Sequence, residues 1–157
     1  MQIVIYTDGA SLGNPGPGGY GVVLLAKGHR KELSQGYLRT TNNRMELMAV
    51  IAGLEALLIP QSKVTVYTDS QYVVNSVEKQ WLFGWEQKNF KGKKNADLWI
   101  RFLKIYRLHT VKFVWVKGHV GIKENERCDK LAVAAAQKQP LLEDTGYLID
   151  DLVLNFE

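Results

Sequence analysis

The stretch IVIYTDG at residues 3–9 is an apolar run that ends in a carboxylate followed by glycine, and VTVYTDS at residues 64–70 has the same layout. Short apolar runs rich in β-branched residues predict buried strands. Asp8 closes the first run and Asp69 closes the second. Since ligands of open α/β sheets bind beyond the carboxyl ends of the strands, both acids are predicted to face a ligand site.

Two further acids stand in short polar signatures, Glu46 within NRME and Asp129 within ERCD. If all four acids converge, each like-charge pair at about 4 Å costs roughly 1 kcal/mol in water and about 4 kcal/mol at an effective dielectric of 20. A divalent cation makes such a cluster tolerable, and carboxylate oxygens suit Mg²⁺ or Mn²⁺. Two-metal sites that act on phosphates take their carboxylates from several elements in this way.

The order of apolar patterns predicts an α/β protein with a mixed five-stranded sheet and helices on its two faces. Three strands form an antiparallel meander, joined at its first bend by the Gly-rich turn at 12–19, and two parallel strands follow. The strands are expected at 3–6, 20–26, 30–37, 64–68 and 111–116, and the helices at 45–58, 70–85, 96–107 and 123–138. The first helix is apolar on nearly every face, which indicates burial. This topology brings the four acids to one edge of the sheet.

Taken singly, each acid has a plainer explanation. Asp8 fits a turn, Glu46 fits a capping box of the form N-x-x-E, Asp69 fits a helix cap, and Asp129 fits a solvated helix position. The joint pattern favours the metal site, because four local contexts must independently place acids where the topology brings them together.

His119 lies just after a predicted strand, in the loop KGHVG at residues 117–121. An imidazole in a flexible loop can shuttle protons near neutral pH. The alternative is an ordinary surface histidine. His29 and His109 have no comparable setting.

The chain has 157 residues and a single cysteine, Cys128. This length predicts one domain with one core. The sequence contains no apolar stretch of about 18 residues and no basic, apolar secretion signal at its amino end. We therefore expect a cytoplasmic protein with no membrane partner, acting as a monomer.

Charge is distributed unevenly along the chain. The net charge is +4, but the last 15 residues carry five acids and no Lys or Arg, so the rest of the chain has a net charge of +9. Such a basic body suits a polyanionic partner. A solvated basic face is the alternative.

Five motifs occur in order: TDG at 7–9, GNPGPGGYG at 13–21, TNNRMEL at 41–47, TDSQ at 68–71, and VKGH at 116–119 together with NERCD at 125–129. In this ordered set the chain resembles the bacterial type 1 ribonucleases H. The resemblance implies a ribonuclease H-like domain over 1–147, followed by an acidic and apolar tail over 148–157. It also implies an endonuclease that hydrolyses the RNA strand of RNA-DNA hybrids, leaving 5′-phosphate and 3′-hydroxyl ends.

By the same resemblance, the metal ligands are Asp8, Glu46, Asp69 and Asp129, which would hold two Mg²⁺ ions, or Mn²⁺ in their place. His119 would be a mobile catalytic histidine. The resemblance also implies contacts to the minor groove, where only RNA offers a 2′-hydroxyl, from Asn14, Asn42 and Gln71. It places a pocket for a phosphate of the DNA strand at Arg39, Thr41 and Asn95.

The segment 79–94 has five lysines against one acid, with aromatic residues between them. It resembles the basic protrusion that holds the hybrid in bacterial members of the family, where lysines neutralise phosphates. The substrate-binding residues expected here are Trp81, Trp85, Lys88, Lys91, Lys93 and Lys94. The alternative for the two tryptophans, four residues apart, is packing in the core.

Two other functions stay open. One is a related nuclease of the same fold that acts on DNA, and the other is a catalytically inert module that binds hybrids. The tail leaves a further choice, because its apolar residues suit either docking on the body or a disordered end.

Overall fold

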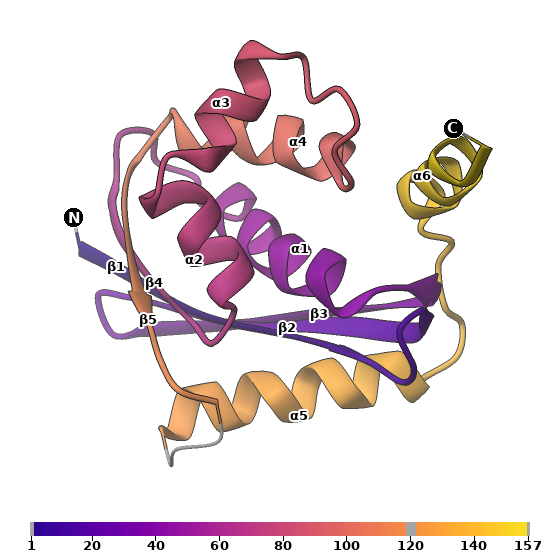
Figure 1. Ribbon diagram of the computed structural model, residues 1–157. Helices are drawn as coiled ribbons and strands as arrows, with labels where there is room; N and C mark the ends of the chain where they lie inside the picture. The colour runs from indigo at the N-terminus through magenta and orange to yellow at the C-terminus, as the bar shows by residue number, and fades with distance from the viewer. Residues whose placement is uncertain (1, 119–121, 157) are drawn as a thin grey trace.

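The computed structural model describes residues 2–118 and 122–156, in which a five-stranded sheet lies between two layers of helices (Figure 1). The strands are β1 (Gln2–Ser11), β2 (Gly16–Ala26), β3 (His29–Thr40), β4 (Lys63–Thr68) and β5 (Thr110–Trp115). Their order across the sheet is β3-β2-β1-β4-β5. The β1–β2 and β2–β3 pairs are antiparallel, whereas the β1–β4 and β4–β5 pairs are parallel. The predicted mixed sheet is confirmed.

Helices cover both faces of the sheet, as predicted. They are α1 (Asn42–Glu55), α2 (Gln71–Glu78), α3 (Trp81–Gln87), α4 (Ala96–Tyr106), α5 (Lys123–Gln137) and α6 (Thr145–Phe156). Figure 1 shows α1 to α4 on one face and α5 on the other, with α6 beside one end of the sheet.

The main core lies between the sheet and α1. This helix is buried almost all round, and its Leu47, Ile51 and Leu54 are inaccessible to solvent, as are Trp99 and Phe102 of α4 behind it. On the opposite face, α5 lies directly on the backbone of β2.

That close approach depends on Gly21. A Cβ atom at this position would overlap the backbone oxygen of Cys128 in α5. Helix α5, which carries Asp129, is therefore held against the sheet at a distance that only glycine permits.

Several boundaries differ from the expected ones: β1 continues to Ser11 instead of ending at 6, β2 begins at Gly16 instead of at 20, β3 ends at Thr40 instead of at 37, and α1 ends at Glu55 instead of at 58. Two further differences concern α2 and the start of α1. The prediction of a single helix over 70–85 is wrong, because Gln80 has a left-handed backbone (φ 65°) that separates α2 from α3. Helix α1 begins at Asn42 rather than at 45, so Glu46 lies in its second turn.

The carboxyl-terminal segment is helical: α6 spans Thr145–Phe156 and so crosses the division expected after Tyr147. The division of the chain into domain and tail stays a prediction. Within residues 2–118 and 122–156, no helix has the length and apolar character needed to cross a membrane.

Candidate metal centre

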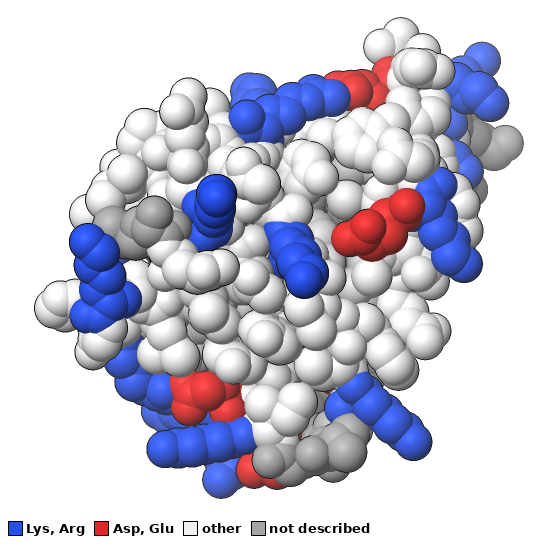
Figure 2. Space-filling view, turned by 90° about the vertical axis from the view of Figure 1, so that its left-hand side faces the viewer, with Lys and Arg blue, Asp and Glu red and all other residues white. Residues whose placement is uncertain are grey.

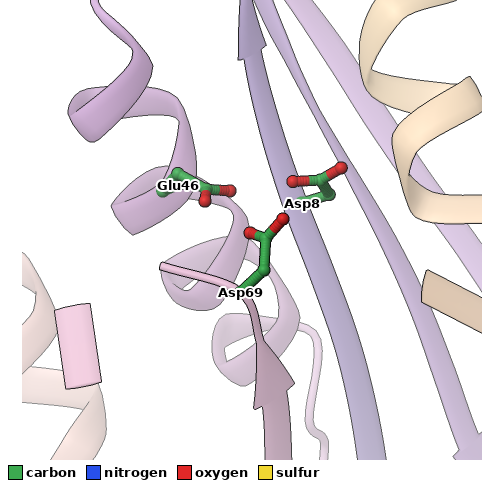
Figure 3. Close-up of side chains that lie close together, drawn as sticks. All are labelled: Asp8, Glu46 and Asp69. Carbon is green, nitrogen blue, oxygen red and sulfur yellow. The ribbon is translucent and has the colours of Figure 1, made fainter. Parts of the chain in front are cut away.

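Three of the predicted carboxylates meet just beyond the point where the parallel pairing of β1 and β4 ends. Asp8 comes from β1, Asp69 follows the end of β4, and Glu46 comes from α1, which lies over them (Figure 3). The register pairs Tyr6 with Tyr67, so β1 and β4 reach this edge together. One oxygen of each carboxylate lies within 4.8 Å of the others, as expected for a group that shares one cation.

Gly9 links the strand to the helix at this point. Its backbone N–H donates hydrogen bonds to Asp8 Oδ1 at 2.9 Å and to Glu46 Oε1 at 2.5 Å. A Cβ atom at Gly9 would overlap the backbone of Met45 and Glu46. A side chain here would push α1 away from β1 and separate the two carboxylates.

Asp129 faces the same site from the other side of the sheet edge. A cavity of about 20 Å³ is lined by Asp8, Asp69 and Asp129, together with Asn125 from the start of α5 and the neighbouring Lys117 and Gly118. A volume of this size holds roughly one water-sized particle. The four predicted metal ligands are thus brought together, although Asp129 is not part of the tightest group.

Without a metal, the carboxylates of Asp8 and Glu46 resist ionisation. Burial, reinforced by the negative charge of Asp69, raises the pKa of Asp8 from 3.8 to about 8. Burial and the hydrogen bond with Asp69 raise the pKa of Glu46 well above its ordinary value. A cation bound between them would remove this penalty, because it favours the charged form of every ligand.

Two buried oxygens show that the site fits a cation. Among the described residues, Asp69 Oδ1 and Asn125 Oδ1 have no hydrogen-bond partner, and both residues line the cavity. Buried oxygens seldom lack a partner. Oxygen donors around a small cavity are what Mg²⁺ and Mn²⁺ take as ligands or as anchors for bound water.

The plainer explanations for Asp8, Glu46 and Asp69 do not hold, whereas Asp129 is a partly exposed helix residue, as its alternative expects. Asp8 lies inside β1 rather than in a turn. The side chain that caps α1 is Thr41, which accepts from Arg44 N at 3.3 Å, and the cap of α2 is Ser70, which accepts from Val73 N at 3.2 Å. Neither Glu46 nor Asp69 is needed to cap the amino terminus of a helix.

The stability of the metal-free protein is expected to fall as pH rises. The folded state keeps the Asp8 proton up to about pH 8, whereas the unfolded chain loses it near 3.8. This contribution is full below the unfolded pKa and is lost as pH rises through the folded one. The slope reaches about 1.4 kcal/mol per pH unit for each retained proton, and Glu46 acts in the same direction.

Urea unfolding in EDTA from about pH 5 to about pH 8 measures this slope. Asp8→Asn removes one titrating group and should flatten it. A free energy of unfolding that stays constant over this range in the unaltered protein would contradict the expectation.

Several of the residues predicted to contact substrate line one pocket of about 490 Å³ at the amino-terminal end of α1. Asn14, Thr41, Asn42, Lys94 and Asn95 line it. Asn14 Oδ1 accepts from Asn42 N at 2.9 Å, so these two candidates for the minor groove are direct neighbours.

The basic protrusion forms a second pocket, of about 390 Å³. Trp81, Trp85, Lys88, Lys91 and Lys93 line it. Each tryptophan lies under an ammonium group at 5.4 Å, from Lys79 over Trp81 and from Lys93 over Trp85. Trp85 also packs edge-on against Trp99 in the core, whereas Trp81 is 47% exposed. The core-packing alternative therefore applies to Trp85 but not to Trp81.

Arg39 and Gln71 line neither pocket; both are exposed, in β3 and at the start of α2. His119 lies outside the described residues. Sequence reasoning overlooked Gly9 and Asn125. Gly9 directly follows a predicted ligand, which was the available signal, whereas Asn125 carried none beyond its place in the motif with Asp129.

Comparisons with known proteins agree with this geometry. Residues 1–137 match the family model "RNase H". A ribonuclease H of Desulforamulus reducens is 61% identical over 146 residues, covering 90% of this chain and 91% of that protein.

Two solved structures have the same fold. LC9-RNase H1, described as a type 1 RNase H with the type 2 active-site motif, has a TM-score of 0.79 at 30% identity. The match covers 99% of this chain and 83% of the LC9-RNase H1 chain. LC11-RNase H1 in complex with an RNA/DNA hybrid has a TM-score of 0.65 at 28% identity, with coverages of 86% and 96%. By sequence and by fold, the chain belongs to the RNase H family of ribonucleases.

Proposed function

We propose that the protein is a metal-dependent endonuclease that hydrolyses the RNA strand of RNA-DNA hybrids, with Mg²⁺ or Mn²⁺ at the cluster of Asp8, Glu46, Asp69 and Asp129. The observation that carries the proposal is the convergence of these carboxylates, two buried and two partly buried, at one site beside a small cavity in a member of the RNase H family. All of the ligands come from one chain, which supports a monomer as the active species.

Ions bound at such a centre activate water, stabilise the leaving oxygen and neutralise charge on the phosphate. The chain's own residues hold and orient the site. Gly9 N–H fixes the carboxylates of Asp8 and Glu46 relative to each other. The unpartnered oxygen of Asp69 is free to bind. We assign proton transfer or product release to His119. The products are proposed to carry 5′-phosphate and 3′-hydroxyl ends.

Recognition of the hybrid is assigned to the two pockets and to the exposed Arg39 and Gln71 outside them. Asn14 and Asn42, with Gln71, are proposed to contact the minor groove, where the 2′-hydroxyl distinguishes RNA from DNA. Arg39, Thr41 and Asn95 are proposed to hold a phosphate of the DNA strand. The adjacency of Asn14 to Asn42, and the shared pocket of Thr41 and Asn95, support this assignment.

The charged surface suits a polyanion. On the face shown in Figure 2, Lys and Arg are spread over the rim and the centre, and Asp and Glu cover less of it. Spread charge of this kind supplies general attraction to nucleic acid, while the pockets supply position.

Trp81→Ala is expected to weaken hybrid binding about tenfold while changing turnover at saturating substrate much less, since the exposed ring is proposed to pack on the sugar-phosphate backbone of the hybrid and a tenfold loss is about 1.4 kcal/mol. Trp81 is 47% exposed and packs under Lys79. Fluorescence anisotropy with a labelled hybrid in EDTA measures the affinity.

The control for this variant is Leu108→Ala, which removes a similarly exposed apolar side chain, at the opposite end of α4 from Asn95. Equal affinities of the two variants for the hybrid would contradict the proposal that Trp81 contacts it.

The proposed function is tested by cleavage of an end-labelled RNA-DNA hybrid with Mg²⁺, Mn²⁺ or EDTA, alongside single-stranded RNA, duplex RNA and duplex DNA. We expect metal-dependent cutting of the RNA strand of the hybrid alone. Cutting of duplex DNA would favour a DNA-acting nuclease, and binding without cutting in either metal would favour an inert hybrid-binding module.

A further inference from the structure

Helix α6 is fixed to the body of the protein at its first turn. Asp144 precedes the helix, and its Oδ1 accepts from Tyr147 N at 3.3 Å. The other oxygen accepts from Thr40 Oγ1 at 2.6 Å and from Arg44 Nε at 2.7 Å. These contacts of Asp144 place the following turns of α6 beside the pocket that contains Thr41 and Asn95.

Asp150, one and a half turns further along α6, makes a second contact with the body. Its Oδ2 accepts from the backbone N–H of Asn95 at 2.7 Å and lies 3.9 Å from Arg44 Nη1. Asn95 is the N-cap of α4. A helix amino terminus beside a guanidinium favours an anion, and a carboxylate has the charge and the acceptor oxygens of a phosphate.

Charge balance does not require Asp150 at this position. Arg44 is already neutralised, because Asp144 and Asp97 both accept from it at 2.7 to 2.8 Å. Asp150 is also 25% exposed, whereas Arg44 is 1% exposed. The Asp150 carboxylate is thus an additional, accessible anion at a position that a ligand could take.

The same pocket holds residues proposed to bind nucleic acid. Asn14, Thr41, Asn42, Lys94 and Asn95 line it on one side, and Tyr147, Asp150 and Asp151 of α6 line it on the other. A phosphate that approached Asn95 would meet the negative charge of α6 and would have to replace Asp150 as the acceptor of the Asn95 N–H.

We propose that α6 is an autoinhibitory element, in which the Asp150 carboxylate occupies the anion position at Asn95 and competes with a backbone phosphate of the hybrid. The proposal rests on the proposed function, since it needs the hybrid's phosphate to bind there. Affinity is reduced by the fraction of molecules in which the position is taken. Release of α6 then accompanies binding of the hybrid.

The test compares hybrid affinity and steady-state kinetics of the full chain with those of Asp150→Asn and Glu143→Gln. Glu143 is an exposed acid of the same segment that lines a different pocket, so its variant controls for the loss of one negative charge. We expect Asp150→Asn to bind the hybrid about three- to tenfold more tightly and to lower KM by a similar factor, with kcat unchanged.

Two results would overturn the proposal. Affinity of Asp150→Asn equal to or weaker than that of the unaltered chain would show that Asp150 does not compete. An equal gain in Glu143→Gln would show a general charge effect. If the unaltered chain neither binds nor cleaves the hybrid, the proposed function itself fails, which separates the two conclusions.

A second measurement follows the contact directly by ¹H–¹⁵N NMR in EDTA. The Asn95 amide resonance should move in Asp150→Asn, and addition of hybrid to the unaltered chain should move both the Asn95 and the Asp150 amides. An Asp150 amide that stays in place at saturating hybrid would also overturn the proposal, because the carboxylate would then still hold its position.

Discussion

Asp8→Asn is expected to reduce hybrid cleavage by at least about a thousandfold, which corresponds to a loss of about 4 kcal/mol of transition-state stabilisation. Asp8, like Asp69, belongs both to the tight carboxylate group with Glu46 and to the cavity lined by Asp129. An amide carries no charge and offers one oxygen, so it weakens cation binding on both sides at once. Single-turnover cleavage in saturating Mg²⁺ measures the effect.

Hybrid binding should survive in the same variant. The proposed binding residues lie in pockets that Asp8 does not line, and removal of a negative charge does not weaken attraction to a polyanion. Anisotropy in EDTA is expected to give an affinity within about twofold of that of the unaltered chain. Retained full turnover in Asp8→Asn would refute the assignment of the metal centre.

The metal-free protein should become more stable when Asp8 is replaced, because the raised pKa of Asp8 reflects a burial and repulsion penalty that asparagine does not pay. Asn Oδ1 can still accept from Gly9 N–H, as Asp8 Oδ1 does. The control is Glu78→Gln, which changes an exposed acid of α2 and should alter neither cleavage nor stability. Lower stability in Asp8→Asn would indicate a structural role instead.

The convergence of the carboxylates was predictable because it depends on local patterns and one rule of topology. Apolar runs ending in Asp8 and Asp69 predict strands, and parallel neighbours bring their carboxyl ends to one edge. The apolar segment around Glu46 predicts a buried helix over that edge. These features lie within a few residues of each acid, so the sequence displays them directly.

Other features have no local signal. The break at Gln80 arises from a left-handed backbone in a residue that rarely adopts it, with no Gly or Pro to mark it. Thr41 rather than Asn43 caps α1, and both residue types are good caps, so composition cannot choose between them. In each case tertiary packing selects a conformation that the local sequence does not indicate.

The buried ion cluster around Arg44 was also overlooked, because its members are distant in the chain. Asp97 and Asp144 are 53 and 100 residues away from Arg44. No periodicity or motif connects charges at such separations. The same cluster fixes the carboxyl-terminal segment to the body, since it binds Asp144, the residue that precedes α6. Because the sequence does not display this cluster, it left docking and disorder of the tail equally open.

Arg44→Met is expected to destabilise the protein by about 3 to 5 kcal/mol, because loss of one partner from a buried ion cluster leaves uncompensated charge. The Arg44 side chain is 1% exposed, and the partner Asp144 is 9% exposed. For a protein of this size the change lowers Tm by about 6 to 20 °C. Thermal and urea unfolding measure it.

Arg107→Met is the matched control. Arg107 also makes two hydrogen bonds to a carboxylate, at 2.7 and 2.8 Å to Glu86, but the two side chains are 52% and 36% exposed. An exposed pair of this kind contributes about 0 to 1 kcal/mol. If Arg44→Met costs no more than Arg107→Met, burial is not what makes the Arg44 cluster stabilising.

The Arg44 cluster also joins stability to binding. Arg44 Nη1 contacts Asn95 Oδ1 at 3.4 Å, and Asp144, which Arg44 holds, begins α6. Among folded molecules, Arg44→Met should therefore loosen α6 and the Asn95 pocket together, giving faster amide exchange in both segments. Hydrogen exchange that changes in α6 alone would contradict this coupling, because the cluster would then anchor only the tail.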